Sequence, residues 1–160
     1  MKGSPVRVAE IGVAGAGDVL VAVGLGSCVA ILLHDPVAGV GGLAHVLLPE
    51  PRPDRSSTAP AKFASTAVPH LVNAMAERGA APERLVARLV GGASMFAALL
   101  TQGTLSTGAR NIAAAREALR EAGIPILGED VGQEHGRTVR FHPEDGRTVV
   151  TSARKDDVLL

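Results

Sequence analysis

The segment "VAILLHDPVAGVGGLAHVLLP" (residues 29–49) contains two apolar runs on either side of a turn signal. The first run, 29–35, ends at Asp35 and Pro36, and the second, 40–49, begins after Gly39. Proline and glycine favour a reversal of the chain, so the segment predicts a β-hairpin. This hairpin decides which residues of the two runs face each other, and the candidate site depends on it.

Further strands and two helices flank the hairpin. Residues 63–79 place apolar side chains four apart on one helical face and stop at a glycine, which predicts a helix. The Ala-rich segment 108–123 predicts a second helix. Further strands are predicted at 5–14, 19–26, 83–92 and 124–130, and a last hairpin at 136–153. We therefore expect an α/β fold, a single-domain layered sandwich with a mixed sheet and at least two covering helices.

Composition narrows the classes of function. The 160 residues carry 16 basic and 16 acidic side chains, with three Phe and no Trp or Tyr. A chain without a basic surplus or stacking aromatics is a poor candidate for nucleic-acid binding. No apolar run is long enough to span a membrane, and one cysteine cannot form an internal disulfide. We expect a cytoplasmic protein.

The single cysteine, Cys28, directly precedes the hairpin, and His45 lies in its second strand. If the turn centres between Pro36 and Val37, paired residue numbers add up to 73 and Cys28 lies opposite His45. A four-residue loop gives a sum of 75 and a diagonal relation. Either odd sum places both side chains on one face, within about 5–8 Å at the backbone, whereas an even sum separates them.

A thiol beside an imidazole has a definite chemistry. The histidine can accept the thiol proton, and the resulting imidazolium stabilises the nucleophilic thiolate. Gly26 and Ser27 precede Cys28 in a glycine-rich turn, whose backbone amides could stabilise an oxyanion. The combination suits acyl transfer from an amide or ester. The alternative is a packed structural thiol, since free cysteine is among the most buried residue types. No spacing typical of a metal site is present.

Several segments together resemble the CheD family of chemoreceptor glutamine deamidases. They are "GLGSCVAILLHDPVAGVGGLAHVLLP", "KFASTAVPHLV", "GGASMF", "GARNIAAAREAL" and "GIPILGEDVGQEHGRTVRF", in matching order and spacing. The resemblance covers nearly the whole chain and implies one CheD-like domain over residues 1–160. It implies a sandwich related to the catalytic domains of glutamine-deamidating toxins. It also implies an enzyme without a cofactor that converts receptor glutamines to glutamates and releases ammonia.

The resemblance also assigns roles to residues. In the family's pattern the nucleophile falls on Cys28 and the histidine on His45, but the position of the family's catalytic threonine is Ala22 here. Ser27 and Ser94 are candidates for the missing third member. Separately from the resemblance, Arg110 and Asn111, in "GARN" at the start of the second helix, are expected to cap that helix or to contact the receptor. The glycines of "VGGAS" (90–94) are expected to pack against the cysteine turn or to form a tight bend.

Three functions therefore stay open at this point. The first is a cysteine-dependent deamidase acting on the cytoplasmic helices of methyl-accepting chemotaxis receptors. The second is a non-catalytic adaptor that regulates a CheC-type phosphatase, which also binds some members of the family. The third is a different cysteine hydrolase, an amidase or a small-molecule thioesterase.

Overall fold

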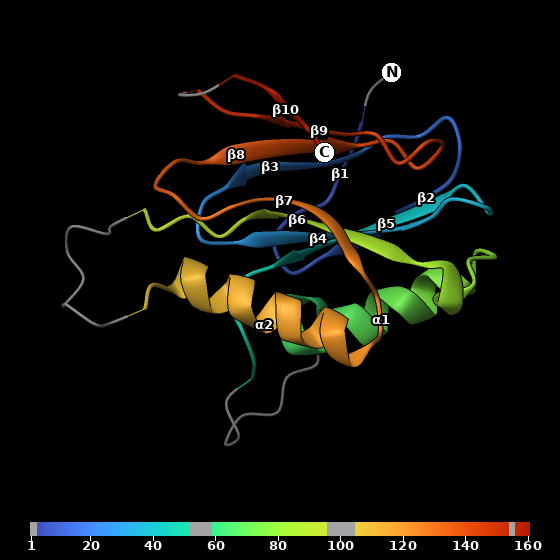
Figure 1. The fold of residues 1–160 in the computed structure, drawn as a ribbon, viewed down its shortest axis with the longest axis horizontal. Helices are drawn as coiled ribbons and strands as arrows, with labels where there is room; N and C mark the ends of the chain where they lie inside the picture. Colours follow the sequence, from blue (N-terminus) through green and yellow to red (C-terminus); the bar gives the residue numbers. More distant parts are fainter. Residues whose placement is uncertain (1–2, 52–58, 96–104, 154–155) are drawn as a thin grey trace.

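Two five-stranded sheets and a layer of helices stack on one another (Figure 1). The structure is a computed structural model that describes residues 3–51, 59–95, 105–153 and 156–160. The middle layer contains the predicted hairpin and is covered by the helices on one face and by the other sheet on the opposite face. No helix among the described residues is long and apolar enough to cross a membrane.

The middle sheet is built around the hairpin. Its central strand, β4 (Val29–Asp35), pairs antiparallel with β5 (Val40–Val46) on one side and β6 (Val86–Gly91) on the other. All residues of β4 and β5 are buried. The two edge strands are β2 (Ile11–Ala14), antiparallel to β5, and β7 (Ile126–Val131), parallel to β6.

The outer sheet contains strands from both ends of the chain. Its order is β1 (Ser4–Pro5), β3 (Leu20–Leu25), β8 (Arg137–Phe141), β9 (Thr148–Thr151) and β10 (Val158–Leu159). The predicted α/β sandwich is confirmed, and its strands divide between two mixed sheets. β3 directly precedes β4 but does not pair with it, because β5 and β6 occupy both edges of β4.

The helices cover the free face of the middle sheet. They are α1 (Ala64–Ala76) and α2 (Thr107–Glu121), with short 3₁₀ turns at Pro60–Lys62 and Pro82–Arg84. Odd-numbered residues of β4, such as Ile31, pack against the helices. Even-numbered residues, such as Cys28, Ala30 and Leu32, pack between the two sheets. The strand periodicity therefore places Cys28 in the layer between the sheets.

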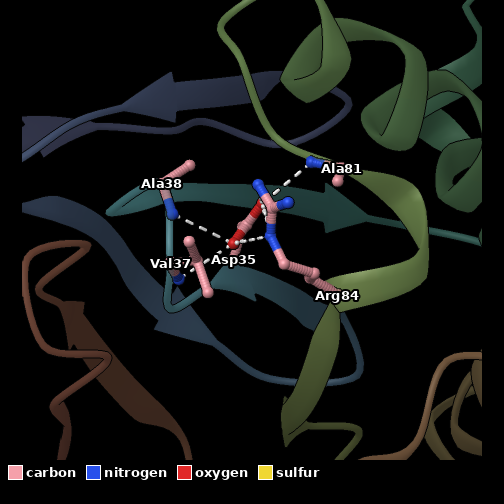
Figure 2. Close-up of polar contacts among 5 residues, drawn as sticks. All are labelled: Asp35, Val37, Ala38, Ala81 and Arg84. Carbon is pink, nitrogen blue, oxygen red and sulfur yellow. Dashed lines mark hydrogen bonds and ion pairs between the residues drawn. The ribbon is translucent and has the colours of Figure 1, made fainter.

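Asp35 fixes the length of the hairpin turn (Figure 2). Its Oδ1 accepts hydrogen bonds from the amides of Val37 (3.0 Å) and Ala38 (3.1 Å), and its carbonyl accepts one from Gly39 (2.9 Å). Gly39 has a φ of 65°, which a side-chain-bearing residue rarely adopts. Residues 36–39 consequently form a four-residue turn, and paired residue numbers of β4 and β5 add up to 75. Of the two registers considered from the sequence, the structure has the one with the longer turn.

Asp35 is also held from outside the hairpin. Its Oδ2 accepts from the Ala81 amide at 2.8 Å and lies 2.8 Å from Nη2 of Arg84. The hydrogen bond from Arg84, together with those from the three amides, holds the pKa of this buried carboxyl well below its usual range. This anchor lies at the opposite end of β4 from Cys28, so it sets the register without touching the site.

Candidate functional site

The turn that carries Cys28 is held by hydrogen bonds to three successive carbonyls. The Gly26 carbonyl accepts from the Ala93 amide (2.8 Å), and the Cys28 carbonyl accepts from the Gly92 amide (2.8 Å). The Ser27 carbonyl between them accepts from the side chain of Asn111 (2.8 Å). With three carbonyls fixed, the peptide planes and hence the directions of the amides are fixed as well.

Gly91 shows why this turn needs glycine next to it. Its φ is 111°, and a Cβ at this position would lie 2.4 Å from the carbonyl oxygen of Cys28. No side chain fits at such a distance. The predicted packing of the "VGGAS" glycines against the cysteine turn is therefore confirmed for Gly91, whereas a Cβ at Gly92 would meet Ile112 of α2.

The hairpin brings Cys28 and His45 onto the same face of the middle sheet. His45 pairs directly with Ala30, and paired residues share a face. Cys28 lies two residues before Ala30 and packs in the same cluster between the sheets. The relation is therefore the diagonal one that the longer turn implies, for which backbone separations of about 7–8 Å are typical.

His45 is oriented by a backbone carbonyl. Its Nδ1 lies 2.9 Å from the carbonyl oxygen of Val6, and a carbonyl can only accept, so Nδ1 carries the proton. Nε2 is then the basic nitrogen. It is buried and has no hydrogen-bond partner within the described part of the chain. An imidazole in this tautomer, held from behind, is arranged as a general base.

Cys28 is largely covered by its surroundings. Its side chain is 9% exposed, and burial raises the pKa of its thiol. The resting side chain is therefore a neutral thiol at pH 7, and a nearby base must remove its proton before it can act as a nucleophile.

Within the described residues, neither candidate third member, Ser27 or Ser94, forms a hydrogen bond to His45. The hydroxyl of Ser94 bonds to the hydroxyl of Ser106 at 2.7 Å. Ser27 and Ser94 both line a hollow of about 290 Å³ at the start of α2, whereas Cys28 packs between the sheets. Ala22 is fully buried in that inter-sheet cluster. The group bound to Nδ1 of His45 is the Val6 carbonyl.

Two residues near the site were not predicted to act there. Val6 binds His45 through its backbone carbonyl, and no pattern of side chains in the sequence predicts such a contact. Asn111 was expected to cap α2 or contact the receptor. The cap is Ser106, whose side chain accepts from the Ala109 amide, and Asn111 is fully buried. Asn111 lies five residues after that cap, in the second turn of α2, and no pattern in the sequence marks it as a buried hydrogen-bond donor.

The turn at Gly26 and Ser27 separates two surface hollows. The one lined by Ser27 and Ser94 lies on the α2 side. A larger hollow of about 550 Å³ lies on the outer-sheet side and is lined by Gly24, Gly26, Arg137 and Thr138, among others. Met95, which is 46% exposed, lines both. Among the described residues, no three His, Cys, Asp or Glu side chains gather closely enough to hold a metal ion.

Comparison with known proteins identifies the family. The family model "CheD chemotactic sensory transduction" matches residues 47–152. "Probable chemoreceptor glutamine deamidase CheD 2" of Geobacter metallireducens is 45% identical over 151 residues, covering 94% of this chain and 93% of that protein. "Probable chemoreceptor glutamine deamidase CheD" of Caldanaerobacter subterraneus subsp. tengcongensis is 41% identical over 145 residues, covering 91% and 90%.

A relative from a third organism and one solved structure were also matched. The protein of that name from Methanococcus maripaludis is 41% identical over 145 residues, covering 91% of this chain and 92% of that protein. The crystal structure of Bacillus licheniformis hypothetical protein YfiH matches with a TM-score of 0.46 and 19% identity, covering 72% of this chain and 47% of that one. On the family model and these relatives together, the chain belongs to the CheD family.

Proposed function

We propose that this chain deamidates glutamine side chains of chemoreceptors, with Cys28 as nucleophile and His45 as general base. The observation that carries the assignment of residues is the state of His45. Its Nδ1–H is bound to the Val6 carbonyl, and its Nε2 is buried, with no partner among the residues that the structure describes, on the face that holds Cys28. The substrate class rests on the relatives, which are named as chemoreceptor glutamine deamidases.

The first half of the reaction forms a thioester. Nε2 of His45 takes the Cys28 proton, and the thiolate attacks the carboxamide carbon of the glutamine side chain. The C–N bond of the resulting tetrahedral intermediate breaks, and His45 returns its proton to the leaving nitrogen, which departs as ammonia. The enzyme is left as a γ-glutamyl thioester on Cys28.

The second half restores the enzyme. His45 deprotonates a water molecule, which attacks the thioester carbon, and the C–S bond breaks to release glutamate and the Cys28 thiol. The net change is one carboxamide and one water converted to a carboxylate and ammonium. No electron transfer occurs, so the reaction as written needs neither an oxidant nor a reductant.

The backbone of the nucleophile turn is the proposed oxyanion site. The carbonyls of Gly26, Ser27 and Cys28 are all held from the protein side, so their peptide planes do not need to reorganise when charge develops. A receptor helix would present its glutamine from one of the two hollows beside this turn, which are lined by Gly26 on one side and by Ser27 on the other. Such a substrate requires an open site of this kind.

The test is peptide mass spectrometry of a chemoreceptor cytoplasmic fragment from the same organism, incubated with the protein. We expect a unit mass gain at defined glutamines with the parent protein. The Cys28→Ala and His45→Gln variants, checked for parent-like circular dichroism, should give none above the fragment alone. Unchanged modification by Cys28→Ala would refute the assignment of the nucleophile, and no modification by the parent would refute the activity.

A CheC-type phosphatase is a second partner that we propose on the family resemblance, and the cytoplasm is the proposed compartment for both. The non-catalytic adaptor function would require this partner and no Cys28-dependent chemistry. Co-purification of the two proteins, compared between the parent and Cys28→Ala, separates binding from catalysis.

A further inference from the structure

Asn111 connects both halves of the proposed catalytic pair. It is the fifth residue of α2, and its side chain is fully buried. Its Nδ2 donates to the carbonyl of Ser27 at 2.8 Å and to the carbonyl of Leu47 at 3.0 Å. Ser27 directly precedes Cys28, and Leu47 follows His45 by two residues.

These two carbonyls flank the point where the hairpin ladder ends. The last pair of β4 and β5 is Val29 with Val46. The next step of the same register would pair Cys28 with Leu47, but the Leu47 amide turns away to the carbonyl of Lys62 (2.9 Å). The side-chain amide of Asn111 therefore bridges the two strands of the hairpin at the point where the hydrogen bonds between the strands end.

The orientation of the Asn111 amide is fixed by its partners. Both partners are carbonyls, which can only accept, so the NH₂ group must face them. Its Oδ1 then lies buried with no hydrogen-bond partner among the residues described. That unpaired oxygen offsets part of the stability from the two donated bonds. Asn111 is therefore better explained by its positioning of the Ser27 and Leu47 carbonyls than by a gain in the stability of the fold.

We propose that Asn111 is a positioning residue of the deamidase, which holds the Cys28 turn at a fixed spacing from the strand that carries His45. The proposal rests on the proposed function for its substrate and on the geometry for its residues. The hydrogen bonds of the Asn111 side chain go to backbone carbonyls, so it acts through Cys28. Its loss therefore lowers the rate of the chemical steps more than it weakens substrate binding.

The experiment compares Asn111→Leu, which has the same side-chain shape but no donors, with the control Leu119→Ala. Leu119 is fully buried in the same helix, packs in the cluster between the helices and the middle sheet, and lies two turns from Asn111. For each protein, thermal unfolding gives the folded fraction, receptor deamidation gives kcat and KM, and iodoacetamide alkylation gives the reactivity of Cys28.

We expect Asn111→Leu to lower kcat by about 10- to 100-fold, with KM within about threefold of the parent value. Alkylation of Cys28 should change by at least about threefold, because the distance to His45 is no longer fixed. Leu119→Ala should lower Tm but keep kcat per folded molecule and alkylation within about threefold of the parent.

Asn111→Asp is the second variant if Asn111→Leu does not fold. A buried carboxyl facing two carbonyls retains its proton and can donate one hydrogen bond, so an intermediate kcat is expected. A parent-like kcat in the variant that folds, or unfolding of both variants at 20 °C, would overturn the proposal. If the parent protein deamidates no receptor, the proposed function fails, and alkylation of Cys28 alone then decides the role of Asn111.

Discussion

Replacing Asp35 with alanine removes the anchor that sets the hairpin register. In the parent protein this fully buried carboxylate accepts from three backbone amides and pairs with Arg84 (Figure 2). The substitution leaves the seven β4–β5 residue pairs intact but frees the turn at residues 36–39. We therefore expect a loss of stability without a loss of the folded site.

The magnitude follows from the bonds that are lost. Each of the three amide bonds has a net value of about 1 kcal/mol, because the amides of the exposed residues Val37 and Ala38 can bond to water after the substitution. The Arg84 side chain is 38% exposed, so its pair with Asp35 is left out of the sum. The expected total is about 3 kcal/mol, equivalent to a decrease in Tm of about 9 °C for a chain of this size.

The effect depends on pH in a defined direction. The pKa of Asp35 is lowered on folding. Its contribution to the free energy of unfolding is therefore complete above the pKa of the unfolded aspartate, about 3.9, and is lost as the pH falls below that value. The difference in the free energy of unfolding between the parent and Asp35→Ala should be constant from pH 7 to pH 5. It should narrow by about 1 kcal/mol at pH 3, less than full linkage predicts because Arg84 reaches solvent.

The assay is urea unfolding followed by circular dichroism at pH 7, 5 and 3, with Asp18→Ala as control. Asp18 is an exposed aspartate, and its substitution should change the free energy of unfolding by less than about 0.5 kcal/mol. A loss below about 1 kcal/mol for Asp35→Ala at pH 7, or a difference that is the same at pH 7 and pH 3, would refute this account of the anchor.

Two further predictions concern the site itself. Ala22→Thr introduces the threonine that the family resemblance implies at this position. Because His45 Nδ1 is already bound to Val6, we expect deamidation within about threefold of the parent and a stability loss of about 1–3 kcal/mol from overpacking. Deamidation assays and urea unfolding check both values, and a gain above about tenfold would show that the Val6 carbonyl is an inadequate substitute. Gly91→Ala should lower Tm by at least about 6 °C and reduce deamidation, since its Cβ would meet the Cys28 carbonyl at 2.4 Å. Gly15→Ala, where a Cβ meets nothing within 4 Å, should leave both unchanged, and equal effects of the two substitutions would contradict the packing argument.

The sequence by itself determined the local elements and the face of the candidate pair. Apolar runs and turn residues in 29–49 predicted the hairpin, and the parity of strand pairing put Cys28 and His45 on one face for either turn length. These features are local, because a strand alternates with a period of two wherever it lies in the fold. The family resemblance supplied the substrate class, which no periodicity encodes.

The choice between the two registers depended on contacts that the sequence does not reveal. The turn itself could close with either length, and the four-residue turn is stabilised from outside by Ala81 and Arg84, which lie more than 40 residues later in the chain. Likewise, the division into two sheets depended on which strands pair with the two edges of β4, and these are β5 and β6.

The tertiary structure alone identified the polar partners of the site. The Val6 carbonyl orients His45 across 39 residues, and Asn111 bridges to Ser27 across 84. Backbone carbonyls are present at every residue, so their sequence positions carry no signal, and only the packing of the layers brings a particular one within hydrogen-bond distance. The residue types of the Cys28–His45 pair could therefore be read from the sequence. Their orientation depends on the long-range packing of the segment after β1, of β5 and of α2.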